Sequence, residues 1–330
     1  MINKAMIEIP PKFAGHPPVN PEAQRQLDVH GNWKGAGGLA EDVRYYGQWM
    51  KEQAFRKIGH LYPKVKVPTD QGGDEATVIA WIWARTVKCP NPACGCEMPL
   101  VRSFVLSKKK GKEAWVEPTF ESGKTCYKVH HGGKPKIEGT VNRKGAVCAC
   151  CGAPVEYPYI RLESREGRMS AQLLAVVAEG KRGRIYITPD EEHKLAAAVE
   201  APENYPTGNL ALRFTGGSCV PYGLDEFHKL FTNRQLTALT TFSELVGEAQ
   251  KQAEAVAAGL HDDAVPLSRG GTGARAYGEA VGVYLAFAVD KAANLWSSIC
   301  GWMNDRGAFR ETFARQAIPM VWDYAEANPF

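Results

Sequence analysis

The sequence predicts an α+β protein in which a β-rich region lies between two helical segments. Apolar residues recur at helical spacing over residues 39–61 and again from residue 225 onward, which indicates amphipathic helices. Residues 78–87 between them are apolar on nearly both faces, as expected of a strand buried inside a sheet. We therefore expect three consecutive parts: a helical segment over 1–76, a β-rich region over 77–215 and a helical segment over 216–330.

The N-terminal segment should contain two helices. Ile2, Met6 and Ile9 share one helical face, and Pro10 and Pro11 follow directly, which should end the first helix there. The second helix is expected over residues 39–61. Its apolar side consists of Val43, Tyr46, Met50, Ala54, Ile58 and Leu61.

The β-rich region should contain a hairpin and a capped helix in addition to the strand over 78–87. The stretches "LVRSFVL" and "EAWVEPTF" flank "SKKKGK", which is typical of a hairpin with Gly111 in its turn. "GRIYI" should form a further strand. Thr188-Pro189-Asp190-Glu191 reads as a capping box with proline at the first helical position, which predicts a helix over 189–200 with His193 on its surface.

The C-terminal segment should be helical throughout. Helical spacing continues from residue 233 to Gly259 and resumes over residues 274–300. A last helix is expected over 309–327, with Pro329 as its stop.

Composition excludes few functions. The chain has 330 residues, of which 44% are hydrophobic, and a formal net charge of +4, so an anionic partner would have to meet local basic patches. The sequence contains no apolar run long enough to span a bilayer, and the start "MINKAMIEIPPKF" does not resemble a signal peptide. We expect a cytoplasmic location, where thiols stay reduced and clustered cysteines favour a metal over disulfides.

Two cysteine clusters predict one structural zinc site. Cys89-x4-Cys94 precedes Gly95, and Cys148-x2-Cys151 precedes Gly152. A glycine after the second cysteine lets the backbone curl so that N–H groups point at sulfur, and two such turns supply the four thiolates of a zinc tetrahedron. We therefore predict Zn2+ bound by Cys89, Cys94, Cys148 and Cys151, in a closed site that braces the fold.

Other ligand sets stay open at this point. Cys96 and Cys150 could replace a neighbour in the site, and His130 and His131 are outside candidates. Unbound reduced thiols are the plain alternative. The remaining cysteines resemble isolated small hydrophobic residues: Cys126, Cys219 and Cys300.

The predicted hairpin carries four lysines at its tip: Lys108, Lys109, Lys110 and Lys112. They favour contact with the phosphates of a nucleic acid. A lysine-rich tip that protects a sheet edge from aggregation explains them equally well.

Several long stretches together resemble one family, the large prokaryotic adenine-specific DNA methylases that carry a zinc-ribbon insertion. The resemblance follows the family's order along nearly the whole chain. The matching stretches are "INKAMIEIPPKFAG", "DEATVIAWIWARTVKCPNPACG", "PLVRSFVLSKKKGK", "AEGKRGRIYI", "FTNRQLTALTTFSELV", "GGTGARAYGEAVGVYLAFAVDK" and "FARQAIPMVWDYAEANPF".

The resemblance implies an incomplete α/β methyltransferase core with an inserted zinc-ribbon-like antiparallel β region and a C-terminal helical segment. In such enzymes a Gly-rich loop binds S-adenosylmethionine, and an Asp/Asn-Pro-Pro-Tyr/Phe tetrapeptide receives the adenine amino group. By the resemblance these motifs would lie before Met1 and after Phe330. The terminal Asn328-Pro329-Phe330 has one proline too few to be the tetrapeptide.

We therefore expect a fragment or subunit of a DNA adenine-N6 methyltransferase that is inactive alone and does not bind S-adenosylmethionine by itself. DNA is the expected partner, together with a second polypeptide that supplies the missing motifs. No catalytic residue is assigned. Trp322 and Asp323 lie near the active site by the resemblance, or on a plain amphipathic helix. The alternative function is a zinc-stapled nucleic-acid-binding module without catalysis, and a third reading makes the zinc region a mere brace.

Overall fold

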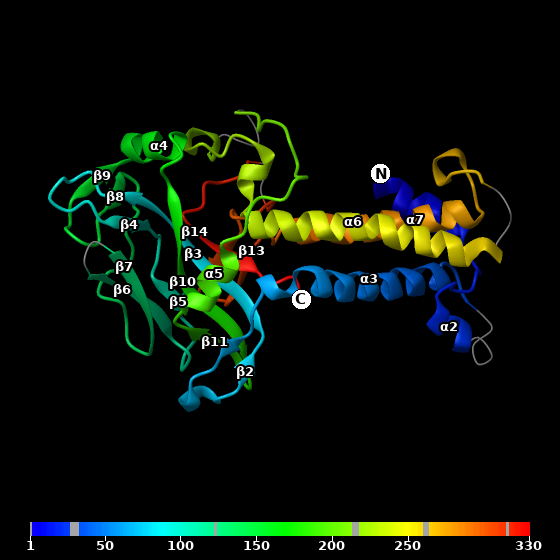
Figure 1. Cartoon of the computed structure of the whole chain (residues 1–330), viewed down its shortest axis with the longest axis horizontal. Helices are drawn as coiled ribbons and strands as arrows, with labels where there is room; N and C mark the ends of the chain where they lie inside the picture. The colour runs from blue at the N-terminus through cyan, green and yellow to red at the C-terminus, as the bar shows by residue number, and fades with distance from the viewer. Residues whose placement is uncertain (1, 27–32, 122–123, 213–217, 260–263, 315–316) are drawn as a thin grey trace. The chain divides into compact units, whose positions relative to one another are not determined.

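The computed structural model is a mixed α+β protein of two compact units, which confirms the expected class (Figure 1). Unit 1 comprises residues 1–59, 238–293 and 330, and unit 2 comprises residues 60–237 and 294–329. Each unit takes chain from distant parts of the sequence, unlike the three consecutive segments expected above. The residues that the structure describes are 2–26, 33–121, 124–212, 218–259, 264–314 and 317–330.

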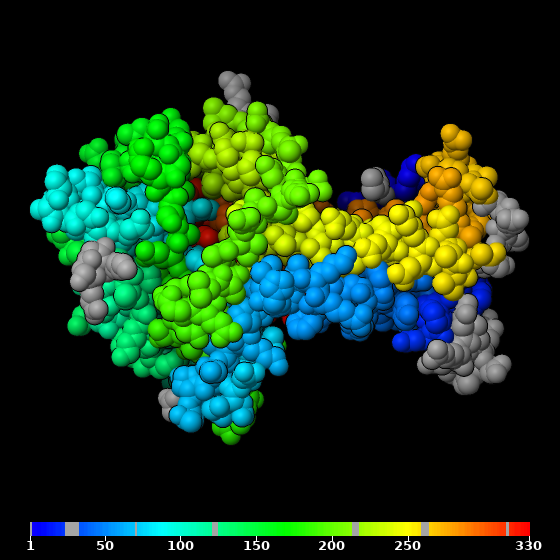
Figure 2. Space-filling model, in the orientation of Figure 1, coloured from blue at the N-terminus to red at the C-terminus, as the bar shows by residue number. Residues whose placement is uncertain are grey.

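Unit 1 is helical. Its long helices are α3 (Gly37–Ile58), α6 (Asn233–Val256), which begins in unit 2, and α7 (Ala274–Ala293). Side chains of α3 and α6 meet along the unit (Figure 2), where Lys57 Nζ lies 3.1 Å from Glu248 Oε1. The short elements are a π-helical turn (Lys4–Glu8), α1 (Ile9–Lys12), α2 (Pro21–Gln26) and 3-10 turns at Ala257–Gly259 and Leu267–Arg269.

A buried carboxylate joins three parts of unit 1. Asp42 on α3 accepts hydrogen bonds of 2.8 Å from the backbone N–H groups of Val19 and Asn20. It also accepts one from the hydroxyl of Tyr277 on α7. Because a buried charge is tolerated only when its acceptors are satisfied, these bonds fix the loop before α2 against both helices.

Unit 2 is built on an antiparallel sheet with the strand order β11-β10-β3-β14, in which β4 also pairs with β3. The central strand β3 is buried along most of its length, as the sequence predicted. The strands are β3 (Val78–Lys88), β4 (Glu97–Leu100), β10 (Ser170–Gly180), β11 (Gly183–Ile187) and β14 (Asp323–Ala327).

The unit also contains smaller antiparallel sheets. The predicted lysine hairpin is present, with Gly111 at φ +74° in its turn. The elements are β1 (Val65–Lys66), β2 (Glu75–Ala76), β5 (Val105–Ser107), β6 (Ala114–Glu121), β7 (Lys124–His131), β8 (Gly145–Val147), β9 (Pro154–Glu156), β12 (Gly301–Met303), β13 (Ala308–Arg310), α4 (Tyr157–Arg165) and α5 (Glu191–Ala197), with 3-10 turns at Gly59–Leu61, Thr69–Gln71, Val220–Tyr222 and Phe227–Leu230.

The prediction of a helix over 309–327 is wrong. The described residues there include the end of β13 and the whole of β14, whose residues pair with β3 from Asp323 opposite Ala84 to Ala327 opposite Ala80. Asp323 is therefore the first residue of a strand and Trp322 directly precedes it, so neither lies on an amphipathic helix. The helix expected over 274–300 ends earlier, at Ala293. Long-range pairing with a central strand overrides local helical spacing.

The first helix also differs from the expectation. Pro10 and Pro11 occupy the first turn of α1, where proline costs no hydrogen bond, so the helix continues past them to Lys12. Of the predicted apolar face only Ile9 is buried, whereas Ile2 and Met6 are exposed.

His193 is buried, not on the surface as expected. Its exposed fraction is 1%, and its Nδ1 accepts a hydrogen bond of 3.0 Å from the indole N–H of Trp81. The N-cap of α5 is Asp190, which accepts from the His193 backbone N–H, while the Thr188 hydroxyl oxygen accepts from the N–H of Val129. Burial lowers the pKa of His193, which favours the neutral ring that this acceptor role needs.

Within the described part of the chain, no helix is both long enough and apolar enough to cross a membrane.

Candidate metal centre

The first cysteine segment is a turn between β3 and β4. Cys89 follows the last residue of β3, and its backbone N–H donates to the carbonyl of Cys96 at 2.9 Å. The carbonyl of Asn91 accepts from the N–H groups of Cys94 and Gly95. Gly95 has φ +57°, a conformation that glycine adopts at little cost. The tight turn therefore holds the thiols of Cys89 and Cys94 on one side.

The second segment is a matching turn between β8 and β9. The N–H of Cys148 donates to the carbonyl of Ala153 at 2.9 Å, and the N–H of Gly152 donates back to the carbonyl of Cys148 at 2.8 Å. Gly152 has φ +76°. As the sequence predicted, Gly95 follows Cys94 in the first turn and Gly152 follows Cys151 in the second.

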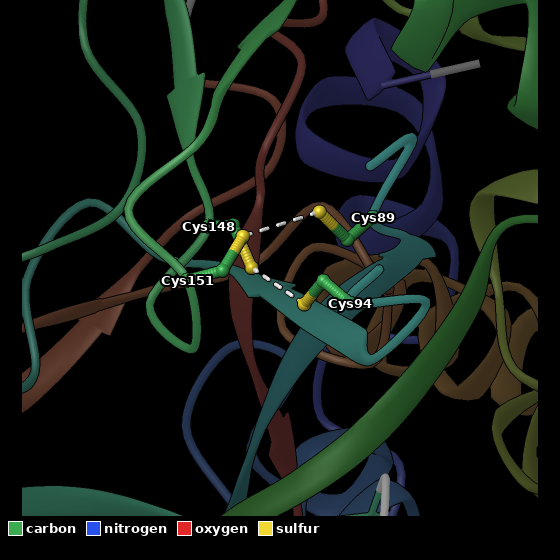
Figure 3. Close-up of side chains that lie close together, drawn as sticks. All are labelled: Cys89, Cys94, Cys148 and Cys151. Carbon is green, nitrogen blue, oxygen red and sulfur yellow. Dashed lines mark hydrogen bonds between the residues drawn. The ribbon is translucent and has the colours of Figure 1, made fainter. Parts of the chain in front are cut away.

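The four predicted cysteines converge on one point (Figure 3). The Sγ atoms of Cys89 and Cys151 are 3.7 Å apart, those of Cys94 and Cys148 are 3.9 Å apart, and all four lie within 4.8 Å of one another. A zinc tetrahedron with bonds of about 2.3 Å has sulfurs about 3.8 Å apart. This cluster could therefore hold a metal ion such as zinc, and four thiolates would leave no coordination position open.

Hydrogen bonds and burial shift the pKa values of the individual thiols in different directions. The backbone N–H of Cys96 lowers the pKa of Cys94 to about 6. Burial raises the pKa of Cys89 to about 12, with the N–H of Asn91 acting in the opposite direction. Burial also raises the pKa of Cys96. A buried sulfur pays for ionisation unless a cation neutralises it, so a bound metal ion would stabilise the thiolate form of this cluster.

The outside candidates lie elsewhere. Among the described residues, no histidine belongs to a group that could hold a metal. His130 stacks on Trp115 and its Nε2 lies 2.8 Å from Glu117 Oε2, while His131 contacts Gln71. Cys126 is exposed on β7, whereas Cys219 and Cys300 are buried, and none of the three belongs to a group of described residues that could hold a metal.

The cysteine turns are anchored in the core of unit 2. Cys89, Cys96 and Cys148 belong to one apolar cluster. Aliphatic and aromatic side chains from the sheet and from α4 complete it, including Met98, Leu100, Ile160 and Trp322. If the cluster binds a metal ion, loss of that ion should therefore loosen packing beyond the two turns.

The lysines of the hairpin tip are exposed, and two of them line a cleft of about 490 Å³. Lys109 and Lys112 face the cleft from the β5–β6 turn, Arg184 from the β10–β11 hairpin and Arg306 from the β12–β13 hairpin. We call this feature the basic cleft. Lys108 and Lys110 are exposed in the same turn.

Backbone and side-chain contacts join the three hairpin tips of the basic cleft. The N–H of Lys108 donates to the carbonyl of Asn304 at 2.8 Å, and the Lys112 ammonium donates to the carbonyl of Arg182. The Arg184 guanidinium lies 5.7 Å from the ring centre of Trp302. One carboxylate, Glu179, also lines the cleft.

Sequence reasoning did not find Arg184 and Arg306. They lie about seventy and two hundred residues from the lysines, and only strand pairing brings them together. The available signal was that both lie in or beside glycine turns between short apolar runs, "EGKRGRIYI" and "NDRGAF".

Comparison with protein-family models, curated proteins and solved structures finds no significant match to this chain.

Proposed function

We propose that this chain is a zinc-braced, DNA-binding part of a DNA adenine-N6 methyltransferase, with the basic cleft as its contact to the DNA backbone. The proposed DNA contact is supported by one observation: four cationic side chains line the same cleft, namely Lys109, Lys112, Arg184 and Arg306. Phosphates of DNA bind such clustered cations and release counterions as they do so.

The cysteine cluster supports a bracing role for the metal. A closed set of four thiolates offers no position for water or substrate, which is the pattern of structural zinc sites. The first turn lies between β3 and β4, and β3 is also the central strand of the sheet. The metal would thus fix the end of the sheet from which β4 and the lysine hairpin follow in sequence.

The DNA contact is tested by reversing charge in the basic cleft. The triple variant Lys109→Glu, Arg184→Glu, Arg306→Glu should bind a DNA duplex far more weakly than the unchanged protein in a fluorescence anisotropy titration. The slope of log affinity against log salt should become shallower by about 3, since each lost phosphate contact removes about one unit.

A matched control carries the same charge change elsewhere: Lys51→Glu, Lys64→Glu, Lys251→Glu. All three lysines are exposed and none lines the basic cleft. The control should keep most of the affinity and most of the salt slope. Equal losses in the two triple variants would show that net charge alone drives binding, and would reject the cleft as the contact.

The methyl-transfer part of the proposal is supported by the sequence resemblance described above. It requires S-adenosylmethionine and the tetrapeptide motif from a second polypeptide or a further segment. In the family's reaction the target adenine leaves the duplex and enters a pocket of the enzyme. This chain would hold the DNA while other segments perform the transfer.

Two measurements separate this proposal from a binding module without catalysis. Titration with S-adenosylmethionine should give no heat and no thermal shift with this chain alone. Combination with the products of the neighbouring reading frames should yield N6-methyladenine in duplex DNA. DNA binding that never leads to methylation in that mixture would favour the alternative, a zinc-stapled nucleic-acid-binding module, which the closed metal site and the basic cleft equally support.

A further inference from the structure

The two cysteines left over from the predicted site lie against it. The Sγ atom of Cys96 is 3.7 Å from that of Cys148. The sulfurs of Cys94, Cys96 and Cys150 also lie within 4.8 Å of one another. Cys94 therefore belongs to two sets of converging thiols at once, and six cysteines from two turns share one small volume.

We propose that this cluster binds a second metal ion and forms a two-ion thiolate centre. The first ion has Cys89, Cys94, Cys148 and Cys151 as ligands. The second ion has Cys94, Cys96 and Cys150, and Cys148 completes its set because it lies beside Cys96. Cys94 and Cys148 bridge the two ions, so that six thiolates give each ion the four ligands that zinc prefers.

Charge balance is compatible with the second ion. A divalent ion with four thiolates has a charge of about −2, and so do two such ions that share six thiolates. The second ion thus allows Cys96 and Cys150 to ionise without adding charge to the centre. With the first ion alone, Cys96, whose exposed fraction is 2%, would remain a neutral thiol beside the four thiolates.

The geometry of the first turn also fits a shared ligand. Cys94 and Cys96 flank Gly95, which has a positive φ. The sharp turn at this glycine lets the thiols of the two cysteines point toward the same ion. Cys150 comes directly before Cys151 in the second turn, so the two sets draw on the same two turns. The inference does not depend on the proposed DNA binding.

The test is metal content in the presence of a reductant, followed by cadmium substitution. The zinc-loaded protein should hold about two zinc ions per chain. The double variant Cys96→Ser, Cys150→Ser should hold about one, and the control Cys126→Ser, an exposed cysteine outside the cluster, should hold about two. About one zinc per chain in the unchanged protein at saturation would overturn the proposal, and none would overturn both the second ion and the first.

Cadmium-113 NMR tests for two bridged ions in the unchanged protein, so the result does not depend on the folding of a variant. The unchanged protein should show two cadmium resonances that split each other, because a bridging sulfur transmits the coupling between the ions. A single resonance, or two resonances without mutual splitting, would contradict the bridged centre.

Discussion

Replacing Glu326 with glutamine should destabilise the protein by about 3–5 kcal/mol, the usual cost of leaving a buried charge without its partner. Glu326 on β14 and Arg234 at the start of α6 have exposed fractions of 1% and 0%. Arg234 Nε donates to Glu326 Oε1 at 2.9 Å, and its NH2 group donates to Oε2 at 2.8 Å. The variant keeps the shape of the side chain and removes only its charge.

Glutamine cannot satisfy the donors around this side chain. Oε1 also accepts from the Thr232 hydroxyl, and Oε2 also accepts from the indole N–H of Trp83. An amide NH2 at either position would therefore face two donors. Burial lowers the pKa of Arg234, but the Glu326 carboxylate outweighs it and leaves that pKa above its ordinary value. The variant loses that carboxylate, but the arginine still stays charged, because a guanidinium is not deprotonated in proteins.

Some interactions of Arg234 survive the change. One NH1 hydrogen bond goes to the carbonyl of Leu61 at 3.0 Å, and the guanidinium lies 4.3 Å from the ring centre of Trp81. These contacts argue for the lower end of the range, about 3 kcal/mol, which is a change of about 150-fold in the folding equilibrium.

Urea unfolding followed by tryptophan fluorescence measures this loss. The midpoint should fall by about 1 M if the slope is about 3 kcal/mol per M. The exposed Glu203→Gln is the matched control and should leave the midpoint unchanged. A loss below about 1 kcal/mol for Glu326→Gln would refute the reasoning, since it would mean that the buried pair contributes no more than an exposed one.

Cys148→Ser should release zinc and lower the melting temperature, measured by elemental analysis and calorimetry, because Cys148 of the second turn contacts Cys94 and Cys96 of the first; unchanged melting of a metal-free protein would count against the metal brace. A pH effect should arise at Asp323, whose pKa burial raises to about 6. Because the folded pKa lies above the unfolded value of about 3.9, this group's contribution to stability is complete below pH 4 and is lost as the pH rises to about 6, by up to about 3 kcal/mol. Asp323→Asn should remove that slope from urea midpoints measured between pH 4 and 7, and an unaltered slope would contradict the assignment.

Local sequence signals predicted the parts of the fold that depend on neighbouring residues. The buried strand, the lysine hairpin with Gly111 in its turn and the two cysteine turns closed by Gly95 and Gly152 are all present. In each case a local feature of the sequence, such as an uninterrupted apolar run or a glycine where φ is positive, is sufficient to determine the conformation.

Local signals failed where a distant partner decides the conformation. Residues 323–327 carry a helical pattern, yet they form a strand because β3 supplies a pairing edge. The sequence predicts a polar helix around His193, yet the side chain of His193 is buried and accepts a hydrogen bond from Trp81. Arg234 and Glu326 have no sequence feature that links them.

The sequence by itself identified four cysteines of the candidate metal site, because cysteine spacing and the glycines that follow Cys94 and Cys151 are local properties of two turns. Only the tertiary structure decided that the two turns face each other, that Cys96 and Cys150 join them, and that arginines from two other hairpins meet the lysine tip. The physical reason is that the sequence specifies directly which side chains are present. The distances between residues far apart in the sequence depend on the strand pairing and burial of the whole chain.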